Sequence, residues 1–186
     1  TVPASAVEGK ITAEQLSLSL GVLGMPGVTA YLALTLVAVP KAGDTVVVPT
    51  AAGAVGSAVG QIAKILGCRT VGIAGGPEKA KLCVDEFGYD IGLDYRSPKL
   101  AEDLAAACPE GINVYFDNTS GEISDIVMAN LAMYARIVIC GTASIASWNP
   151  LPIGPRVHRQ ILTRRARMEG FIIFDHDDKY ADAMAQ

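Results

Sequence analysis

The chain has 186 residues, of which 51% are hydrophobic, 18% charged and 6% aromatic, and its formal net charge is -4. This size and a mean hydropathy of +0.35 support one domain with a sizeable core and exclude an intrinsically disordered chain. A general nucleic-acid-binding surface would carry the opposite sign of charge, so we expect no nucleic-acid partner.

The first 40 residues predict a helical lead-in. Thr12–Gln15 has the form of a capping box, which indicates a helix start. The stretch between Glu14 and Lys41 is uncharged and long enough to span a membrane, but three glycines and Pro26 interrupt it. We therefore expect two buried helical pieces, the second over residues 28–37, and no membrane association.

From residue 41 onward the pattern becomes regular. Short apolar runs rich in β-branched residues are typical of strands buried on both faces. They predict strands over 45–48, 69–74, 91–93, 112–116, 136–140 and 168–174. Apolar residues at helical spacing predict intervening helices over 55–66, 78–87, 98–107 and 123–131.

This alternation predicts an α/β fold with a doubly wound parallel sheet, the Rossmann fold, of about six strands with helices on both faces. Residues 1–40 would pack on this domain, which occupies residues 41–186. The sixth strand would lie at a sheet edge, and an open apolar edge favours pairing with a second copy, so we expect a homodimer.

The loop after the first strand carries a dinucleotide fingerprint. Ala51–Gly56 matches G-x-G-x-x-G with Ala in place of the first Gly, and it stands between a predicted strand and a predicted helix. Gly53 would let the backbone approach a pyrophosphate and Gly56 would let the helix pack closely on the strand. The alternative is a small-residue loop needed only for tight packing.

The end of the second strand favours NADP over NAD. An NAD site has Asp or Glu here to bind the ribose hydroxyls. This chain has Ala74-Gly75-Gly76 instead, followed by Lys79 in the first turn of the next helix. The turn leaves space for a ribose phosphate with a cation near it, although Lys79 also fits a solvated helix lysine.

Polar residues end two further strands. Asn118 follows the fourth strand, where it would contact a nicotinamide-side ribose or simply form a turn. Cys140-Gly141-Thr142 ends the fifth, and a nucleophilic Cys140 is disfavoured because no histidine lies nearby in sequence. The four cysteines show no metal-ligand spacing, which indicates reduced thiols in a cytoplasmic protein and no metal. An arginine run over 156–167 fits a solvated or interface helix better than an RNA-binding patch.

Five motifs in order resemble one family: Gly24–Tyr31 (GMPGVTAY), Ala51–Ser57 (AAGAVGS), Gly72–Lys79 (GIAGGPEK), Phe116–Asn118 (FDN) and Arg167–Phe171 (RMEGF). The chain is similar to the zinc-independent medium-chain dehydrogenase/reductases, in the group of prostaglandin, alkenal double-bond and curcumin reductases. The resemblance implies NADPH-dependent reduction of the C=C bond of α,β-unsaturated ketones and aldehydes. It covers nearly the whole chain.

The resemblance also implies which residues contact the cofactor. They are the glycine-loop residues Gly53, Ala54, Val55 and Gly56, then Lys79 and Tyr95 around the ribose phosphate, and Asn118, Cys140, Gly141, Thr142, Phe171, Ile172 and Ile173 along the rest of the molecule. Family members also have an N-terminal catalytic domain and a C-terminal return segment. Both are missing from this chain, so we expect the cofactor domain of a longer protein, inactive alone.

One departure affects the chemistry. The loop after the fifth strand often carries a Tyr-Asn pair in this family, whereas residues 142–149 contain Trp148 and Asn149 and no tyrosine. We therefore assign no catalytic residue. A quinone reductase on the same cofactor domain and a non-catalytic NADP-sensing module remain alternatives. A methyltransferase is disfavoured, because it would need an acidic residue after the second strand.

Overall fold

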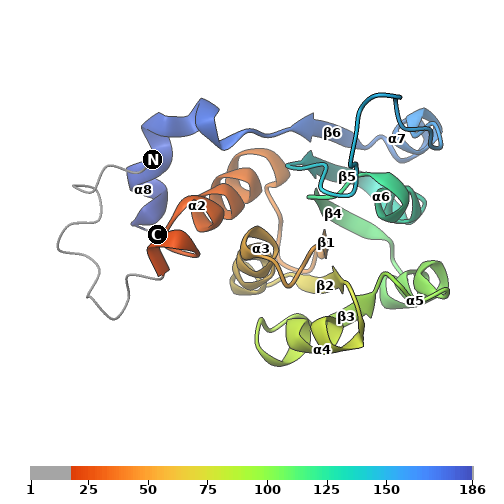
Figure 1. Ribbon diagram of the computed structural model, residues 1–186, viewed down its shortest axis with the longest axis horizontal. Coiled ribbons are helices and arrows are strands. Elements are labelled where there is room, and N and C mark those ends of the chain that lie inside the picture. The colour runs from red at the N-terminus through yellow and green to blue at the C-terminus, as the bar shows by residue number, and fades with distance from the viewer. Residues whose placement is uncertain (1–17, 186) are drawn as a thin grey trace.

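The computed structural model describes residues 18–185, so the helix expected to begin at Thr12 lies outside the described part. A six-stranded sheet in the order β3-β2-β1-β4-β5-β6 forms the centre of the molecule (Figure 1), and every neighbouring pair of strands is parallel. The strands are β1 (Thr45–Pro49), β2 (Arg69–Ala74), β3 (Ile91–Asp94), β4 (Ile112–Asp117), β5 (Leu131–Ile139) and β6 (Arg167–Gly170). The predicted doubly wound sheet is confirmed.

Helices cover both faces because alternate strand residues point to opposite sides of the sheet. On one face Val46 and Val48 pack with α2 (Met25–Leu32), the π-helix η2 (Ala33–Ala38), α3 (Ala54–Ile65), α4 (Pro77–Asp85) and α8 (Tyr180–Met184). On the other, Val47 packs with α5 (Leu100–Ala107), α6 (Gly121–Met128) and residues within and beside α7 (His158–Arg164). A 3-10 helix, η3 (Ile173–Lys179), leads into α8. No helix within residues 18–185 is both long enough and apolar enough to cross a membrane.

Several predicted boundaries are wrong. Strand β5 begins at Leu131 rather than residue 136 and ends at Ile139 rather than residue 140. Strand β6 ends at Gly170 rather than residue 174, because Phe171 and Ile173 turn into the core beneath α2. Helix α6 ends at Met128, since Leu131 already pairs with Ile112 in the sheet. Helix α5 begins at Leu100, two residues after Pro98, because residues 97–100 first form a turn.

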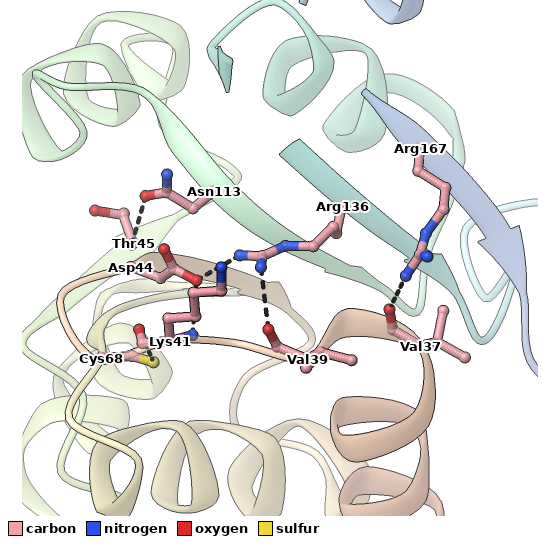
Figure 2. A network of polar contacts seen from close by, with 9 residues as sticks. All are labelled: Val37, Val39, Lys41, Asp44, Thr45, Cys68, Asn113, Arg136 and Arg167. Carbon is pink, nitrogen blue, oxygen red and sulfur yellow. Dashed lines mark hydrogen bonds and ion pairs between the residues drawn. The ribbon is translucent and has the colours of Figure 1, made fainter. Parts of the chain in front are cut away.

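A polar network fixes helix η2 to the amino ends of the strands (Figure 2). Arg136 on β5 donates to the carbonyl of Val39 at 3.0 Å and pairs with Asp44, while Arg167 on β6 donates to the carbonyl of Val37. The last carbonyls of a helix have no partner within it and carry partial negative charge. The two guanidinium groups therefore satisfy this helix end and attach it to the sheet. The predicted solvated or interface helix over the arginine run 156–167 therefore ends too late: α7 ends at Arg164, and Arg167 is the first residue of β6.

Candidate functional site

The candidate site lies at the carboxyl edge of the sheet, where β1 and β4 are neighbours. The chain leaves β1 toward β2 on one side and later returns to β4 on the other, so this is the topological switch point of the sheet. In doubly wound folds the crevice outside this point receives the ligand. The loop from β1 to α3, the fingerprint Ala51–Gly56, stands here.

Close packing explains the small residues of this loop. A Cβ atom at Gly56 would lie 2.3 Å from the carbonyl oxygen of Thr50, so no larger residue fits. Ala51 is fully buried, and a Cβ at Gly72 on β2 would lie 2.8 Å from the Ala51 Cβ. The missing side chain of Gly72 thus makes room for alanine where the fingerprint has its first glycine.

The N-terminus of α3 is open toward the crevice. Gly53 is its N-cap residue and provides no side-chain cap. The first intrahelical bond runs from the Ser57 amide to the Gly53 carbonyl at 2.9 Å, so the preceding amides of residues 54–56 have no partner within the helix. Such amides, at the positive end of the helix dipole, form a site for a phosphate group.

A second group of residues surrounds the turn between β2 and α4. The Asp94 carboxylate accepts hydrogen bonds from the amides of Gly76 at 2.7 Å and Arg96 at 2.9 Å, and so joins the ends of β2 and β3. A Cβ at Gly75 would lie 2.9 Å from the Tyr95 ring, and the Arg96 guanidinium lies 5.8 Å from the centre of that ring.

This phosphate cluster consists of Lys79, Tyr95 and Arg96. Lys79 is exposed in the first turn of α4, and Arg96 Nη1 lies 3.7 Å from the Cβ position of Gly76, the N-cap of that helix. Two cations and a phenol near one helix N-terminus suit a phosphate. Sequence analysis missed Arg96 and Asp94. Both residues lie at the carboxyl edge of the sheet, because the parallel register pairs Asp94 at the end of β3 with Ala74 at the end of β2.

The turn after β4 is built around a buried carboxylate. Asp117 is fully buried and accepts hydrogen bonds from the amides of Thr119 and Ser120 and from the Ser124 hydroxyl, each at 2.8 Å. It thereby fixes the backbone on either side of Asn118. The Asn118 Nδ2 atom is buried without a hydrogen-bond partner in the described chain. A buried donor without a partner is costly, so Asn118 fits a residue whose partner is a ligand.

The end of β5 packs against the same turn. The amides of Cys140 and Gly141 donate to the Asp117 carbonyl at 2.8 and 3.1 Å, and the amide of Ile145 donates to Thr142. Burial, together with the Asp117 charge, raises the pKa of the Cys140 thiol to about 11. Cys140 is therefore protonated at neutral pH, which agrees with a lining role and argues against a nucleophile.

The residues after β6 divide between core and surface. Phe171 is buried and stacks on His176 with ring centres 5.0 Å apart, and its amide donates to the Ile139 carbonyl at the end of β5. Ile173 also faces the core, whereas Ile172 is exposed. This segment stays adjacent to the end of β5, but only Ile172 offers a free side chain.

A cavity of about 480 Å³ opens beyond the ends of β3 and β4. It is lined by Tyr95, Ser120, Gly121, Glu122, Ile123, Asp125, Ser144, Ile145, Trp148, Pro152, Ile153 and Gly154. Tyr95 is shared with the phosphate cluster, so the two features adjoin. Within residues 18–185, no three His, Cys, Asp or Glu residues come together in a group that could hold a metal ion.

Comparison with known proteins identifies the class. Residues 54–186 match the family model described as zinc-binding dehydrogenase, and the chain belongs to this family. It is 47% identical over 161 residues to the NADPH-dependent curcumin reductase of Escherichia coli (strain K12), covering 84% of this chain and 47% of that protein. It is 44% identical over 171 residues to a 2-alkenal reductase (NADP(+)-dependent) of Nicotiana tabacum, covering 89% and 48%.

A solved structure agrees with these relatives. CurA from Vibrio vulnificus in complex with NADPH has a TM-score of 0.86 and 45% identity to this chain, covering 94% of it and 53% of that protein. The resemblance to reductases of this group is confirmed. The chain spans about half the length of the curated relatives it matches.

The glycine loop gives a first prediction. Replacing Gly53 with Val places a branched side chain at the exposed N-cap of α3, where the pyrophosphate of NADPH would lie. We expect NADPH affinity to fall by at least about tenfold. The melting temperature should fall less than in a Gly56 variant, because a Cβ at Gly53 would lie 3.0 Å from the Thr50 carbonyl oxygen and one at Gly56 would lie 2.3 Å from it. The matched variant, Gly56→Ala, instead collides with the Thr50 carbonyl and should lower the melting temperature. Calorimetric NADPH binding by Gly53→Val equal to that of the parent would contradict the assignment of this loop.

Proposed function

We propose that this chain binds NADPH and forms the cofactor-binding part of an oxidoreductase that reduces the C=C bond of α,β-unsaturated ketones or aldehydes. The observation that carries the proposal is the 45% identity, over 94% of the chain, to a protein solved in complex with NADPH. The names of the curcumin and 2-alkenal reductases support the substrate class. The N-terminus of α3 at the switch point offers backbone amides that suit the pyrophosphate of such a cofactor.

Each part of the cofactor has a corresponding group in the chain. The amides of residues 54–56 would bind the pyrophosphate, and the phosphate cluster would bind the 2′-phosphate of the adenosine ribose. Asn118 Nδ2 would donate to a ribose hydroxyl on the nicotinamide side, which would give the buried amide its missing partner. Gly141 allows the ends of β4 and β5 to approach, since a Cβ there would lie 2.9 Å from the Asn118 carbonyl oxygen.

In this proposal the chain contributes binding and orientation. When bound, NADPH supplies a hydride from its nicotinamide ring to the β-carbon of the substrate. The Asp117-centred turn holds Asn118 rigid, so the ribose would keep one position relative to the sheet edge. The enolate oxygen needs a hydrogen-bond donor and the α-carbon needs a proton. We assign neither role to a residue of this chain, and Cys140, a half-buried thiol whose S–H is only a weak donor, is unsuited to both.

The phosphate cluster gives a second prediction. A charge-assisted hydrogen bond contributes about 1.5–3 kcal/mol when buried, and less at an exposed site. We expect Lys79→Ala and Arg96→Ala each to weaken NADPH binding about tenfold and to leave NADH binding nearly unchanged. The effect should shrink as salt is raised, because the cluster is solvent-accessible. Calorimetry with both cofactors at two salt concentrations measures it.

Lys81→Ala is the control for this experiment. Lys81 lies on the same helix but pairs with Asp85 on its exposed face, so its removal should affect neither cofactor. Equal losses for NADPH and NADH in the cluster variants would mean that Lys79 and Arg96 maintain the turn rather than bind the phosphate.

We further propose a cytoplasmic homodimer that acts on small enones, enals or quinones. All four cysteines are free, which suits a reducing compartment. Strand β6 is the last strand of the sheet and its four residues are exposed; within residues 18–185 it pairs with β5 alone. An uncovered edge of this kind favours pairing with the same strand of a second copy.

The edge gives a third prediction. We expect light scattering at tens of micromolar to report a dimer, and Met168→Lys on β6 to shift it toward monomer because the added charge opposes edge pairing. Ile65→Lys, an equally drastic change on the exposed surface of α3, should leave the dimer intact. A monomeric parent chain would contradict the proposed interface.

The reaction is tested with the full-length protein that carries this chain. We expect it to oxidise NADPH in the presence of enones or enals, as followed by NADPH absorbance across a panel that also contains quinones. Turnover of quinones alone would favour a quinone reductase. NADPH binding without turnover of any substrate would favour an NADP-sensing module. Absence of NADPH binding would contradict the proposal as a whole.

A further inference from the structure

Tyr89 is a buried tyrosine in the segment between α4 and β3, outside the candidate site. Its side chain is 2% exposed and packs in the core on the face of the sheet that α3 covers. The hydroxyl at the end of this side chain donates to the carbonyl of Gly56 at 2.6 Å. Gly56 is the third residue of α3. A residue from a different part of the chain thus bonds to the first turn of the helix that would receive the pyrophosphate.

The backbone on both sides of the Tyr89 side chain is held in place. The Tyr89 amide donates to the Cys83 carbonyl of α4 at 3.0 Å. The next residue, Asp90, accepts a hydrogen bond from the Thr70 amide of β2 at 2.8 Å and pairs with Lys64 of α3 at 2.7 Å. The phenol is therefore presented to α3 from a backbone that is itself attached to α4, β2 and α3.

The bond from Tyr89 continues through the first turn of α3 as a chain of peptide groups. The Gly56 carbonyl and the Ser57 amide belong to one peptide group, and that amide donates to the Gly53 carbonyl at 2.9 Å. The Gly53 carbonyl in turn shares a peptide group with the Ala54 amide, which has no partner within the helix. Every link runs in the same direction, from the Tyr89 hydroxyl to the Ala54 amide. The chain ends at one of the three amides that would bind the pyrophosphate.

A hydrogen bond at one end of such a chain strengthens the donor at the other end. Donation to a carbonyl oxygen draws electron density toward that oxygen and away from the amide of the same peptide group, so the amide becomes a better donor. Over two peptide groups this polarisation reaches the Ala54 amide, where it adds to the field of the helix dipole. Burial raises the pKa of the Tyr89 phenol well above its ordinary value, so the hydroxyl remains a donor at neutral pH.

We propose that Tyr89 is a positioning residue for the cofactor, whose hydroxyl aligns and polarises the first turn of α3 and so strengthens pyrophosphate binding at residues 54–56. The inference rests on the proposed NADPH binding and adds to it a side chain that does not touch the ligand. The ring and the hydroxyl have separate roles. The ring fills the space left by Gly60 and Gly72, whereas the hydroxyl acts on the helix. Removing the hydroxyl alone therefore isolates its effect on the cofactor.

The test replaces Tyr89 with Phe, which keeps the ring and removes the hydroxyl. Dissociation constants are measured by calorimetry for NADPH and for adenosine 2′-phosphate, which carries the phosphate expected in the phosphate cluster but no pyrophosphate. A change of up to about 30% in a charge-assisted hydrogen bond corresponds to a change of about threefold in affinity. We therefore expect Tyr89→Phe to weaken NADPH binding about threefold and to leave adenosine 2′-phosphate binding unchanged. A purely structural role of the hydroxyl would not separate the two ligands.

The matched control is Thr70→Val, which removes another buried hydroxyl, one that bonds to the neighbouring residue Asp90. It should lower the melting temperature, as Tyr89→Phe should, but leave NADPH affinity at the parent value. Equal NADPH affinities of the parent and Tyr89→Phe would overturn the inference while leaving the proposed function intact. Equal losses for the two ligands, or the same NADPH loss in Thr70→Val, would also overturn it, because either result would indicate a structural role alone. Failure of the parent to bind NADPH would overturn the proposed function itself.

Discussion

The close packing of helix α3 on strands β1 and β2 determines the geometry of the whole carboxyl edge. It requires glycine at three positions, Gly56, Gly60 and Gly72. Tyr89 occupies the space that the last two leave: a Cβ at Gly60 would lie 2.3 Å from its ring and one at Gly72 would lie 3.1 Å from it. The Tyr89 hydroxyl donates to the Gly56 carbonyl at 2.6 Å. Burial holds the pKa of this phenol well above its ordinary value, so the donor is retained. The N-terminus of α3 thus has a fixed direction.

Two buried or partly buried carboxylates fix the backbone of the other turns at this edge, as Tyr89 fixes the N-terminus of α3. Asp94 joins the ends of β2 and β3, and Asp117 organises the turn after β4, each by accepting backbone amide hydrogen bonds. Within residues 18–185 neither carboxylate forms a salt bridge, and their hydrogen-bond partners are backbone amides and hydroxyl groups. In the same part of the chain Lys79 and Arg96 form no salt bridge either, so both cations remain available to a ligand. The carboxylates Glu122 and Asp125, which line the adjoining cavity, give that cavity the opposite charge.

Strand positions and the glycine loop were predictable because their signals are local. Continuous β-branched runs such as Val46–Val48 identify strands buried on both faces, and the fingerprint stands directly after one of them. The contribution of Arg96 depends on strand register, and the roles of Tyr89 and Gly72 depend on packing between segments far apart in sequence. The end of β6 was predicted too late because Phe171 and Ile173 are apolar, as strand residues would be. In the structure they are apolar because they pack in the core beneath α2, and the sequence pattern is the same in both cases.

The arginine network at the amino ends of the strands, which joins Arg136 and Arg167 to the end of η2, lies at the edge opposite the cofactor crevice. The anchoring of the lead-in helix and the recognition of the ligand therefore use separate residues on opposite margins of one sheet. Mutations that retune the nucleotide preference need not loosen that anchor. This separation allows ligand specificity to change during evolution. Substitutions at the carboxyl edge can alter the bound nucleotide while the arginine contacts at the amino edge continue to hold the lead-in helix on the sheet.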